Sequence, residues 1–249
     1  MRARRRLAQA AELCVLPQEQ RLSAFVASTG RTGKTIYVPN YPRVEEIGPL
    51  RAPASRSITF YYHGSLNAER LPFAVLEALS RTEENPRLIV VGYETIGSSG
   101  YMSRFLAAAK TLGVAGRVTY LGPLPRKDIL DVTSRADVGL SFMPPMSKDI
   151  NMAHMTGASN KPFDYLARGL MLLVSDLPDW RAMFVHPGYA RACNPYDAAD
   201  LHAAMRWCVE NPTEVRAMGE AGRQRIASDW NYETCFAPVL HTLEQRAAS

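Results

Sequence analysis

One short stretch in the second half of the chain has the residue types that could hold a phosphorylated ligand. It runs from Gly157 to Gly169 and reads GASNKPFDYLARG. Ser159 or Asn160 can cap the start of a helix, and Pro162 suits its first turn. Gly169 can end the helix in a left-handed conformation. The stretch therefore predicts a capped helix whose first turn is open to a ligand.

The first turn of that helix has the properties of an anion site. Its exposed amides and the positive charge of Lys161 attract phosphate. Asp164 lies one helical turn further on, where a carboxylate can accept both hydroxyls of a ribose. Phosphate at the helix tip and ribose one turn in describe a bound nucleoside diphosphate. The alternative is a capped core helix with solvated Lys161 and Asp164 side chains.

Two further glycine turns follow apolar strands. His63-Gly64-Ser65 comes after the first of these strands, and Val91-Gly92-Tyr93 comes after the next. Ligands bind at the carboxyl ends of strands in an open parallel sheet, and glycine lets the backbone approach them closely. Arg70, at the opening of the following helix, can reach a phosphate. Glycine after a buried strand is also common in turns that bind nothing.

Histidines and methionines supply lesser candidates. His63 could contact a sugar or phosphate, or it could make a structural hydrogen bond to the backbone. His154 lies in the loop 144–157 among Met143, Met146, Met152 and Met155. Such a loop could be an adaptable flap over a sugar or a mobile loop with apolar anchors. No carboxylate–histidine cluster indicates a metal site.

Short β-branched runs alternate with amphipathic helical patterns along most of the chain. Strands are predicted at Glu12–Leu16, Thr35–Val38, Ile58–His63, Arg87–Val91, Val118–Leu121, Val138–Phe142, Met171–Val174 and Ala190–Cys193. Helices are predicted at Gln18–Ala27, Leu71–Arg81, Tyr101–Leu112, Lys127–Arg135, Lys161–Arg168, Trp180–Phe184, Ala199–Glu210, Thr213–Ser228 and Tyr232–Arg246. Strands joined through helices predict an α/β fold, a Rossmann-like parallel sheet flanked by helices.

The organisation of the chain changes after Val38. Pro39-Asn40-Tyr41-Pro42 stops regular structure, and the next residues add prolines, a glycine and mixed charges, which is linker composition. The preceding strand, helix and strand bury too little to form a core alone. We therefore expect that part to pack on the rest or to belong to a larger domain.

The segment Ser28–Thr35 reads STGRTGKT, which is close to a phosphate-binding P-loop. A P-loop needs a strand before it and a helix after it. Here the predicted order is reversed, and Ser28 replaces the first required glycine. A polar turn between helix and strand explains the segment better.

Taken together, the motifs resemble those of a known family. The pattern SNKxFDYxAxG, followed by an apolar strand and Ser175-Asp176-Leu177-Pro178, resembles the donor-site signature of the retaining, sucrose-synthase-like (group 1) GT-B glycosyltransferases. His63–Arg70 is similar to the family's Gly-Arg-x-x-x-x-Lys phosphate motif, and Val118–Gly122 to its turn beside the base. Arg135–Val138 is similar to the entry to the strand before the donor loop. The resemblance spans about Ile36 to Arg246.

The resemblance implies a donor site for a nucleotide-diphosphate sugar and no cofactor or metal. The implied donor-binding residues are Gly64, Ser65, Arg70, Gly92, Gly122, Ser159, Asn160, Lys161 and Asp164. The base would lie near Gly122, the diphosphate near Ser65, Arg70 and Lys161, and the ribose on Asp164. No catalytic residue is assigned.

Three substitutions and the length depart from the family pattern. Thr156 stands where the family has its first motif glutamate. Ser65 stands where the family has an arginine after the first glycine. Asp164 replaces the second glutamate and reaches one methylene less far.

The resemblance further implies that residues 1–42 are a truncated remnant of an N-terminal acceptor domain, 43–57 a linker, 58–230 the donor-binding domain, and 231–249 a helix crossing back. A missing N-terminal domain or a partner chain would then complete the protein.

Composition limits the other partners. The 249 residues carry a net charge of +5 without a basic stripe, which does not indicate nucleic acid. Part of the charge is in Arg2, Arg4, Arg5 and Arg6, which could touch anionic lipids at the inner face of a membrane. The four scattered cysteines favour reduced thiols in a cytoplasmic protein. No run is apolar enough to span a membrane, and no secretory signal follows the basic start.

The resemblance implies a glycosyltransferase that passes a sugar from a nucleotide-diphosphate donor to an unidentified glycan, lipid-linked or polysaccharide-precursor acceptor, with retention. The first rival is an inactive nucleotide-sugar-binding module, or one half of a split enzyme. The second rival is a sugar-nucleotide epimerase of the same architecture. An epimerase would need acid–base residues in the cleft, and the sequence shows no clear set.

Overall fold

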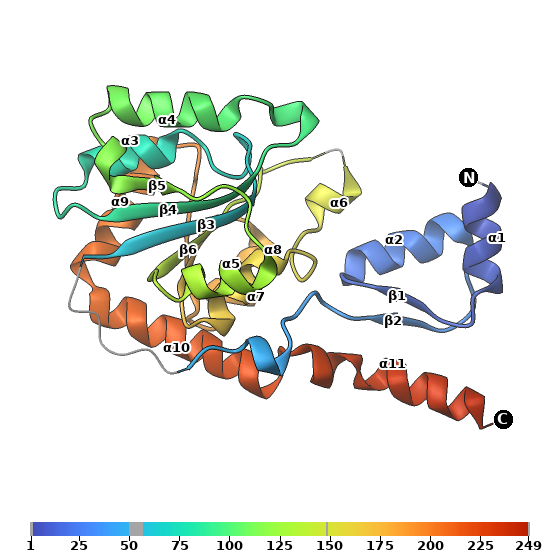
Figure 1. The fold of residues 1–249 in the computed structure, drawn as a ribbon. Helices are drawn as coiled ribbons and strands as arrows, with labels where there is room; N and C mark the ends of the chain where they lie inside the picture. The colour runs from blue at the N-terminus through green and yellow to red at the C-terminus, as the bar shows by residue number, and fades with distance from the viewer. Residues whose placement is uncertain (1, 50–56, 148, 249) are drawn as a thin grey trace.

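The computed structural model of the chain describes residues 2–49, 57–147 and 149–248 (Figure 1). Part of the predicted linker, residues 50–56, therefore lies outside the described residues. The larger part of the molecule is built on a six-stranded parallel sheet with the order β5-β4-β3-β6-β7-β8. Its strands are β3 (Thr59–Ser65), β4 (Arg87–Tyr93), β5 (Val118–Tyr120), β6 (Val138–Ser141), β7 (Met171–Ser175) and β8 (Ala190–Cys193). The predicted α/β fold with a Rossmann-like parallel sheet is confirmed.

Helices cover both faces of this sheet because its strands are apolar on both sides. One face carries α3 (Ala74–Arg81), α4 (Tyr101–Thr111) and α9 (Ala198–Glu210). The other carries α5 (Arg126–Thr133), α7 (Asn160–Ala167) and α10 (Pro212–Ser228). Side chains alternate along β3, so Phe60 and Tyr62 pack under the first group and Tyr61 under the second. The strand order reverses at β3, next to β6, where a doubly wound sheet binds its ligands.

Most predicted elements lie within a few residues of the observed ones, and three segments differ. The basic start forms helix α1 (Arg2–Ala10), which was predicted only as a charged end. The predicted loop before Gly157 contains the short helix α6 (Ile150–Ala153). The helix predicted at Trp180–Phe184 is instead one turn, α8 (Pro178–Trp180), followed by a π-turn at Arg181–Val185.

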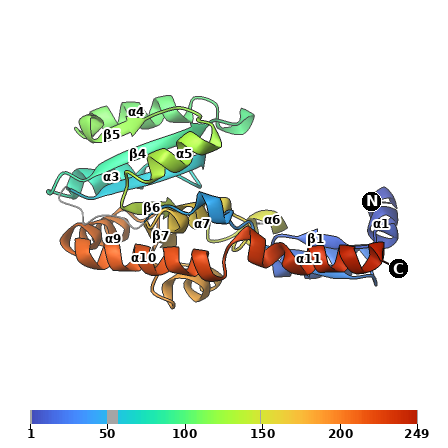
Figure 2. The same ribbon diagram turned by 60° about the horizontal axis from the view of Figure 1, so that its bottom comes forward.

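A small unit precedes the large sheet. Parallel strands β1 (Cys14–Leu16) and β2 (Thr35–Tyr37) are joined by α2 (Glu19–Thr29). The last helix, α11 (Tyr232–Ala247), runs beside these two strands in both views (Figure 2). Lys34 Nζ lies 2.9 Å from Thr242 Oγ1 along that contact. How the chain divides into domains stays a prediction.

The P-loop-like segment is a structural turn. It follows helix α2 and leads into strand β2, which is the order expected for a turn that does not bind phosphate. The Arg31 guanidinium is 4% exposed and donates to backbone carbonyls, among them Ala11 O at 2.7 Å and Lys34 O at 2.7 Å. Its charge is therefore used to tie α1 to the start of β1 and β2.

Helix α7 sits unusually close to the sheet because β6 has no side chain at Gly139. A Cβ at this position would lie 2.2 Å from Cδ2 of Tyr165. Tyr165 is buried, and its hydroxyl accepts a hydrogen bond of 3.0 Å from the His63 amide at the end of β3. This close packing fixes α7 relative to β3, the two elements that carry most of the predicted site.

Gly139→Ala should therefore lower the free energy of unfolding by about 1–3 kcal/mol, since the buried Tyr165 ring has no room to move aside. Equilibrium urea denaturation would measure the change. Gly116→Ala is the matched control, because a Cβ there meets nothing within 4 Å. If both variants unfold at the same urea concentration, the close packing of α7 against β6 is not needed for stability.

Candidate functional site

The ends of β3 and β4 approach each other through glycine backbone. Gly64 and Gly92 are paired in the parallel register and both have positive φ, +126° and +154°. A Cβ on Gly92 would lie 1.9 Å from the carbonyl oxygen of Gly64, so only glycine fits. The Gly92 amide also donates to Gly122 O at 2.9 Å. The three glycines predicted to face a donor are therefore joined at one edge of the sheet.

Lys161 lies against the same edge. Its ammonium is 3.1 Å from the position that a Cβ on Gly64 would occupy, and it lies 5.4 Å from the centre of the Tyr62 ring. The sequence-predicted lysine and the sequence-predicted glycine turn are thus brought together. Burial and the neighbouring Arg70 lower the pKa of Lys161 to about 7, against the attraction of Asp164.

Arg70 is the second cation at this edge. The residue is only 6% exposed, and the hydrogen-bond acceptors of its guanidinium are sulfur atoms: Met143 Sδ on Nη1, and Met152 Sδ at 3.1 Å from Nη2. Thioethers are weak acceptors, and burial lowers the pKa of the guanidinium. Two cations near one glycine turn therefore have few negatively charged or polar partners. This arrangement favours binding of an anion.

The first turn of α7 matches the prediction only in part. Ser159 is the N-cap residue, in extended conformation and 4% exposed, but its side chain makes no capping hydrogen bond. Gly169 ends the helix with φ +72°, as expected. Asn160 is exposed and lines a cavity that Gly64 does not line.

Asp164 is not open to solvent. Its side chain is 2% exposed, and three N–H donors converge on its two oxygens. His63 Nε2 lies 3.2 Å from Oδ2, Arg126 Nη1 lies 2.7 Å from Oδ2, and Arg126 Nη2 lies 2.8 Å from Oδ1. Burial alone would raise the pKa of this carboxyl, but the hydrogen bonds from His63 and Arg126 outweigh it and hold the pKa below its ordinary value.

His63 is a neutral partner in this group. Burial lowers the pKa of its imidazole more than Asp164 raises it, which favours the neutral ring. Nε2 lies 3.2 Å from the Asp164 carboxylate, so the proton of the neutral ring belongs on Nε2. Its Nδ1 atom is buried and has no hydrogen-bond partner among the described residues. The ring thus contacts the Asp164 side chain and not the backbone, and a contact of His63 with a sugar or phosphate stays a prediction.

Arg126 extends the group to a fourth segment. Its Nε and Nη2 atoms lie 2.7 and 3.1 Å from the two oxygens of Glu46, just before the residues that lead into the large sheet. The guanidinium therefore holds two carboxylates, Asp164 on α7 and Glu46 on the segment after β2. Neither Arg126 nor Glu46 stands out by spacing, because an arginine at the start of a helix is usually solvated.

The remaining candidates lie on the loop before α7. The Thr156 hydroxyl donates to Asp179 Oδ2, so the position of the family's first glutamate is tied to the turn after β7. His154 ends α6 and is partly exposed. Arg21 of α2 contacts Met155 Sδ at 2.9 Å and the carbonyl of Asn151. The loop 144–157 is thus held on one side by Arg70 and on the other by the small unit.

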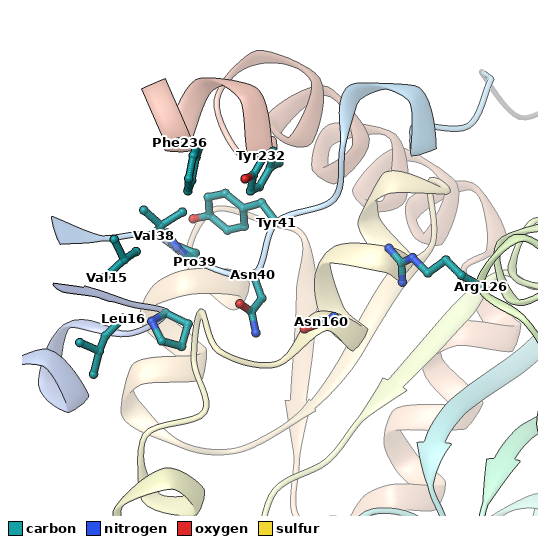
Figure 3. Close-up of a pocket in the computed structure, with 11 residues that line it drawn as sticks. Val15, Leu16, Val38, Pro39, Asn40, Tyr41, Arg126, Asn160, Tyr232 and Phe236 are labelled. Carbon is teal, nitrogen blue, oxygen red and sulfur yellow. The ribbon is translucent and has the colours of Figure 1, made fainter. Parts of the chain in front are cut away.

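Arg126 and Asn160 line two cavities, the first of which is drawn in Figure 3. One, of about 400 Å³, lies between the carboxyl ends of β1 and β2, the chain at 38–41 and the start of α11. The other, of about 540 Å³, is lined by Tyr41, Arg43, Glu45, Glu46 and Tyr232 as well. Of the sequence-predicted donor residues, Asn160 lines both cavities, and Lys161 and Gly64 line neither.

The described residues contain neither a metal-binding cluster nor a membrane-spanning helix. No group of three or more histidines, cysteines or carboxylates there could hold a metal ion. No helix within 2–49, 57–147 and 149–248 is both long and apolar enough to cross a membrane. All four cysteines are free thiols.

Comparison with known proteins defines the class. The fold is that of a GT-B glycosyltransferase domain, and residues 73–241 match the family described as glycosyl transferase-like. The chain belongs to this family of group 1 glycosyltransferases. The family resemblance noted from the motifs is confirmed.

Individual relatives are distant. Glycogen synthase from Mycobacterium tuberculosis is 24% identical over 187 residues, which cover 74% of this chain and 42% of that protein. Sucrose-phosphate synthase from Thermosynechococcus elongatus superposes with a TM-score of 0.73 at 18% identity, over 98% of this chain and 61% of that one. Anabaena HepE (Alr3699), in complex with UDP and glucose, superposes with a TM-score of 0.75 at 14% identity, over 98% of this chain and 66% of that one. The chain therefore spans less than two thirds of these proteins.

The lowered pKa of Lys161 predicts a pH-dependent effect of Lys161→Met on stability. The folded state loses the proton near pH 7, whereas the unfolded chain keeps it to the ordinary pKa of 10.5. The buried charge thus costs stability fully below pH 7, and this cost fades as the pH rises. Lys161→Met should raise the free energy of unfolding most at pH 6 and less at pH 9.

Urea denaturation at the two pH values would measure this difference. Lys110→Met, on the exposed side of α4, is the control and should change little at either pH. A Lys161→Met variant that is less stable than the wild type at pH 6 would show that the ammonium is well solvated or paired in the folded protein.

Proposed function

We propose that this chain binds a nucleotide-diphosphate sugar and takes part in transferring its glycosyl group to an acceptor, with retention. The observation that carries the proposal is the meeting of Lys161, Arg70 and the Gly64 turn at the carboxyl edge of the sheet. Two partly buried cations beside bare backbone and a helix tip form a site for a diphosphate.

Charge development explains how such a site would act. When the bond between sugar and diphosphate breaks, negative charge grows on the leaving phosphate. Lys161, Arg70 and the amides of the α7 tip stabilise that charge without moving, because they are already fixed by packing. A bound anion also raises the affinity of Lys161 for its proton. The protein contributes position and electrostatics, and no metal ion is required.

The donor-binding residues we propose are those that the family resemblance implies. Gly64, Ser65, Arg70 and Lys161 hold the diphosphate, with Ser159 and Asn160 at the helix tip. Gly92 and Gly122 shape the turns at the base end, and Asp164 belongs to the nucleoside half of the site. HepE, of the same fold, has been crystallised with UDP and glucose, which supports a nucleotide sugar as the ligand class.

A second candidate function rests on one departure from the family pattern. Thr156 replaces the first motif glutamate, and its hydroxyl is bonded to Asp179. A chain that keeps the diphosphate cations but lacks this carboxylate could bind a nucleotide sugar without transferring it. A missing N-terminal domain or partner chain would give the same behaviour. Binding without release of nucleoside diphosphate from any donor sugar would favour this module.

We further propose that the protein acts in the cytoplasm, in polysaccharide biosynthesis, with a peripheral contact to the inner membrane face. Helix α1 presents arginines and an exposed leucine, Leu7, of which 71% is accessible. Arg4 and Arg5 also contact α2, through the Phe25 ring and the Ser28 carbonyl. A basic helix anchored in this way can approach anionic lipid without unfolding.

Calorimetric titration tests the central proposal. A nucleoside diphosphate (UDP, GDP or ADP) should bind better than its nucleoside. Lys161→Ala should weaken the diphosphate by about 10- to 150-fold, the equivalent of roughly 1.5–3 kcal/mol for a charge-assisted contact, and leave the nucleoside nearly unchanged. Asp164→Asn should weaken both alike.

Two controls accompany this titration. Lys110→Ala removes an exposed lysine on α4 and should leave both affinities unchanged. Circular dichroism checks that every variant is folded. A wild-type protein with no preference for diphosphate over nucleoside would exclude a phosphate site at the tip of α7.

The membrane contact predicts salt-sensitive binding to anionic vesicles. Sedimentation with phosphatidylserine-containing vesicles should fall steeply between low and physiological ionic strength, because exposed charges are screened. At low ionic strength, the double variant Arg2→Gln and Arg6→Gln should sediment with these vesicles less than the wild type does. Equal sedimentation with neutral and anionic vesicles would contradict the contact.

A further inference from the structure

The carboxylate of Asp164 has little capacity left for a ligand. A carboxylate offers about four acceptor positions, and His63 and Arg126 already use three. A ribose that donates both of its neighbouring hydroxyls needs two positions. Direct binding of a ribose would therefore displace at least one of the three donors.

Displacement of Arg126 is unfavourable. It would remove a two-pronged guanidinium from a carboxylate whose side chain is 2% exposed. A buried carboxylate without its counter-charge is strongly destabilised, because it has lost both water and partner. Ribose hydroxyls are neutral donors and do not replace that charge.

Arg126 itself is accessible. Its side chain is 43% exposed, and it stands where the two cavities of about 400 and 540 Å³ meet. In Figure 3 its guanidinium end points toward Asn160 and Tyr41, into the space between them. Asn160 is followed directly by Lys161, so the tip of α7 connects this space with the proposed diphosphate site.

The guanidinium is held still while its face stays open. Four of its five N–H groups bond to Asp164 and Glu46, which leaves one N–H on Nη1 without a bond to a described residue. A planar cation fixed in this way can stack on a nucleobase and donate to a base or ribose oxygen. It loses little conformational freedom when a ligand binds, since both carboxylates already fix it.

We propose that Arg126, and not Asp164, is the side chain that contacts the nucleoside, and that Asp164 and Glu46 are positioning residues that lock its guanidinium. This inference rests on the proposed function and specifies its nucleoside half. The ligand class is the nucleoside portion of a nucleoside diphosphate, in the space between Arg126, Asn160 and Tyr41.

The experiment is a titration of three probes against one set of variants. The probes are the tightest-binding of UDP, GDP and ADP, its nucleoside, and inorganic pyrophosphate. Arg126→Met should weaken the nucleoside and the nucleoside diphosphate by a similar factor, about 10-fold or more, which is typical of one lost charge-assisted contact. Pyrophosphate, which does not reach Arg126, should bind as in the wild type.

A stronger affinity of Arg126→Met for the nucleoside would overturn the proposal. If Asp164 accepts the ribose hydroxyls, Arg126 competes with the ligand, and Arg126→Met strengthens nucleoside binding. Arg126→Lys guards against a folding defect in the Met variant, because an ammonium still compensates Asp164 but cannot form the planar fork. We expect it to weaken the nucleoside and spare pyrophosphate. Equal or tighter nucleoside binding by this variant also overturns the proposal.

A matched control separates the site from general effects of losing an arginine. Arg223 on α10 forms a comparable two-pronged pair with Glu220, at 2.8 and 2.7 Å, and lines neither cavity. Arg223→Lys should leave all three affinities unchanged. A purely structural role of Arg126 would reduce pyrophosphate and nucleoside binding together. Failure of the wild type to bind any nucleoside diphosphate would instead reject the proposed function.

Discussion

A single buried carboxylate, Asp164, sets the arrangement of the candidate site. A charge with a 2% exposed side chain must be compensated inside the protein, and here His63 from β3 and Arg126 from α5 provide the compensation. Arg126 in turn holds Glu46, which lies on the chain between the small unit and the large sheet. One buried charge thus connects β3, α5, α7 and the segment that follows β2.

At the neighbouring glycine turn, buried charges lack such compensation. Lys161 and Arg70 are cations that packing has largely removed from water, and the acceptors of Arg70 are two methionine sulfurs. Such an arrangement lowers stability in the absence of a ligand and is retained in proteins mainly where it serves binding. The site is therefore divided into a cationic half beside Gly64 and a compensated, mainly anionic half around Asp164.

The small unit is coupled to the loop that carries these residues. Asn40 donates hydrogen bonds to the carbonyls of Gly157 and Ala158 at 2.9 and 2.8 Å. Arg21 contacts Met155 and Asn151 in the loop 144–157. Helix α11 packs along the same unit, through Thr242. A change in the position of the small unit would therefore reach the start of α7 through hydrogen bonds and not only through loose packing.

The sequence alone determined the class of fold and the identity of the cationic half. Alternation of apolar strands with amphipathic helices is a local pattern, and the motif from Ser159 to Gly169 places Lys161 at a helix tip by spacing alone. The compensated half was decided only by tertiary structure. His63, Arg126 and Asp164 are far apart in the chain, and their protonation and exposure depend on which neighbours folding brings to the carboxylate. Arg126 has an ordinary solvent-facing position in the sequence, and only the packing of α5 against α7 makes it the partner of a buried charge.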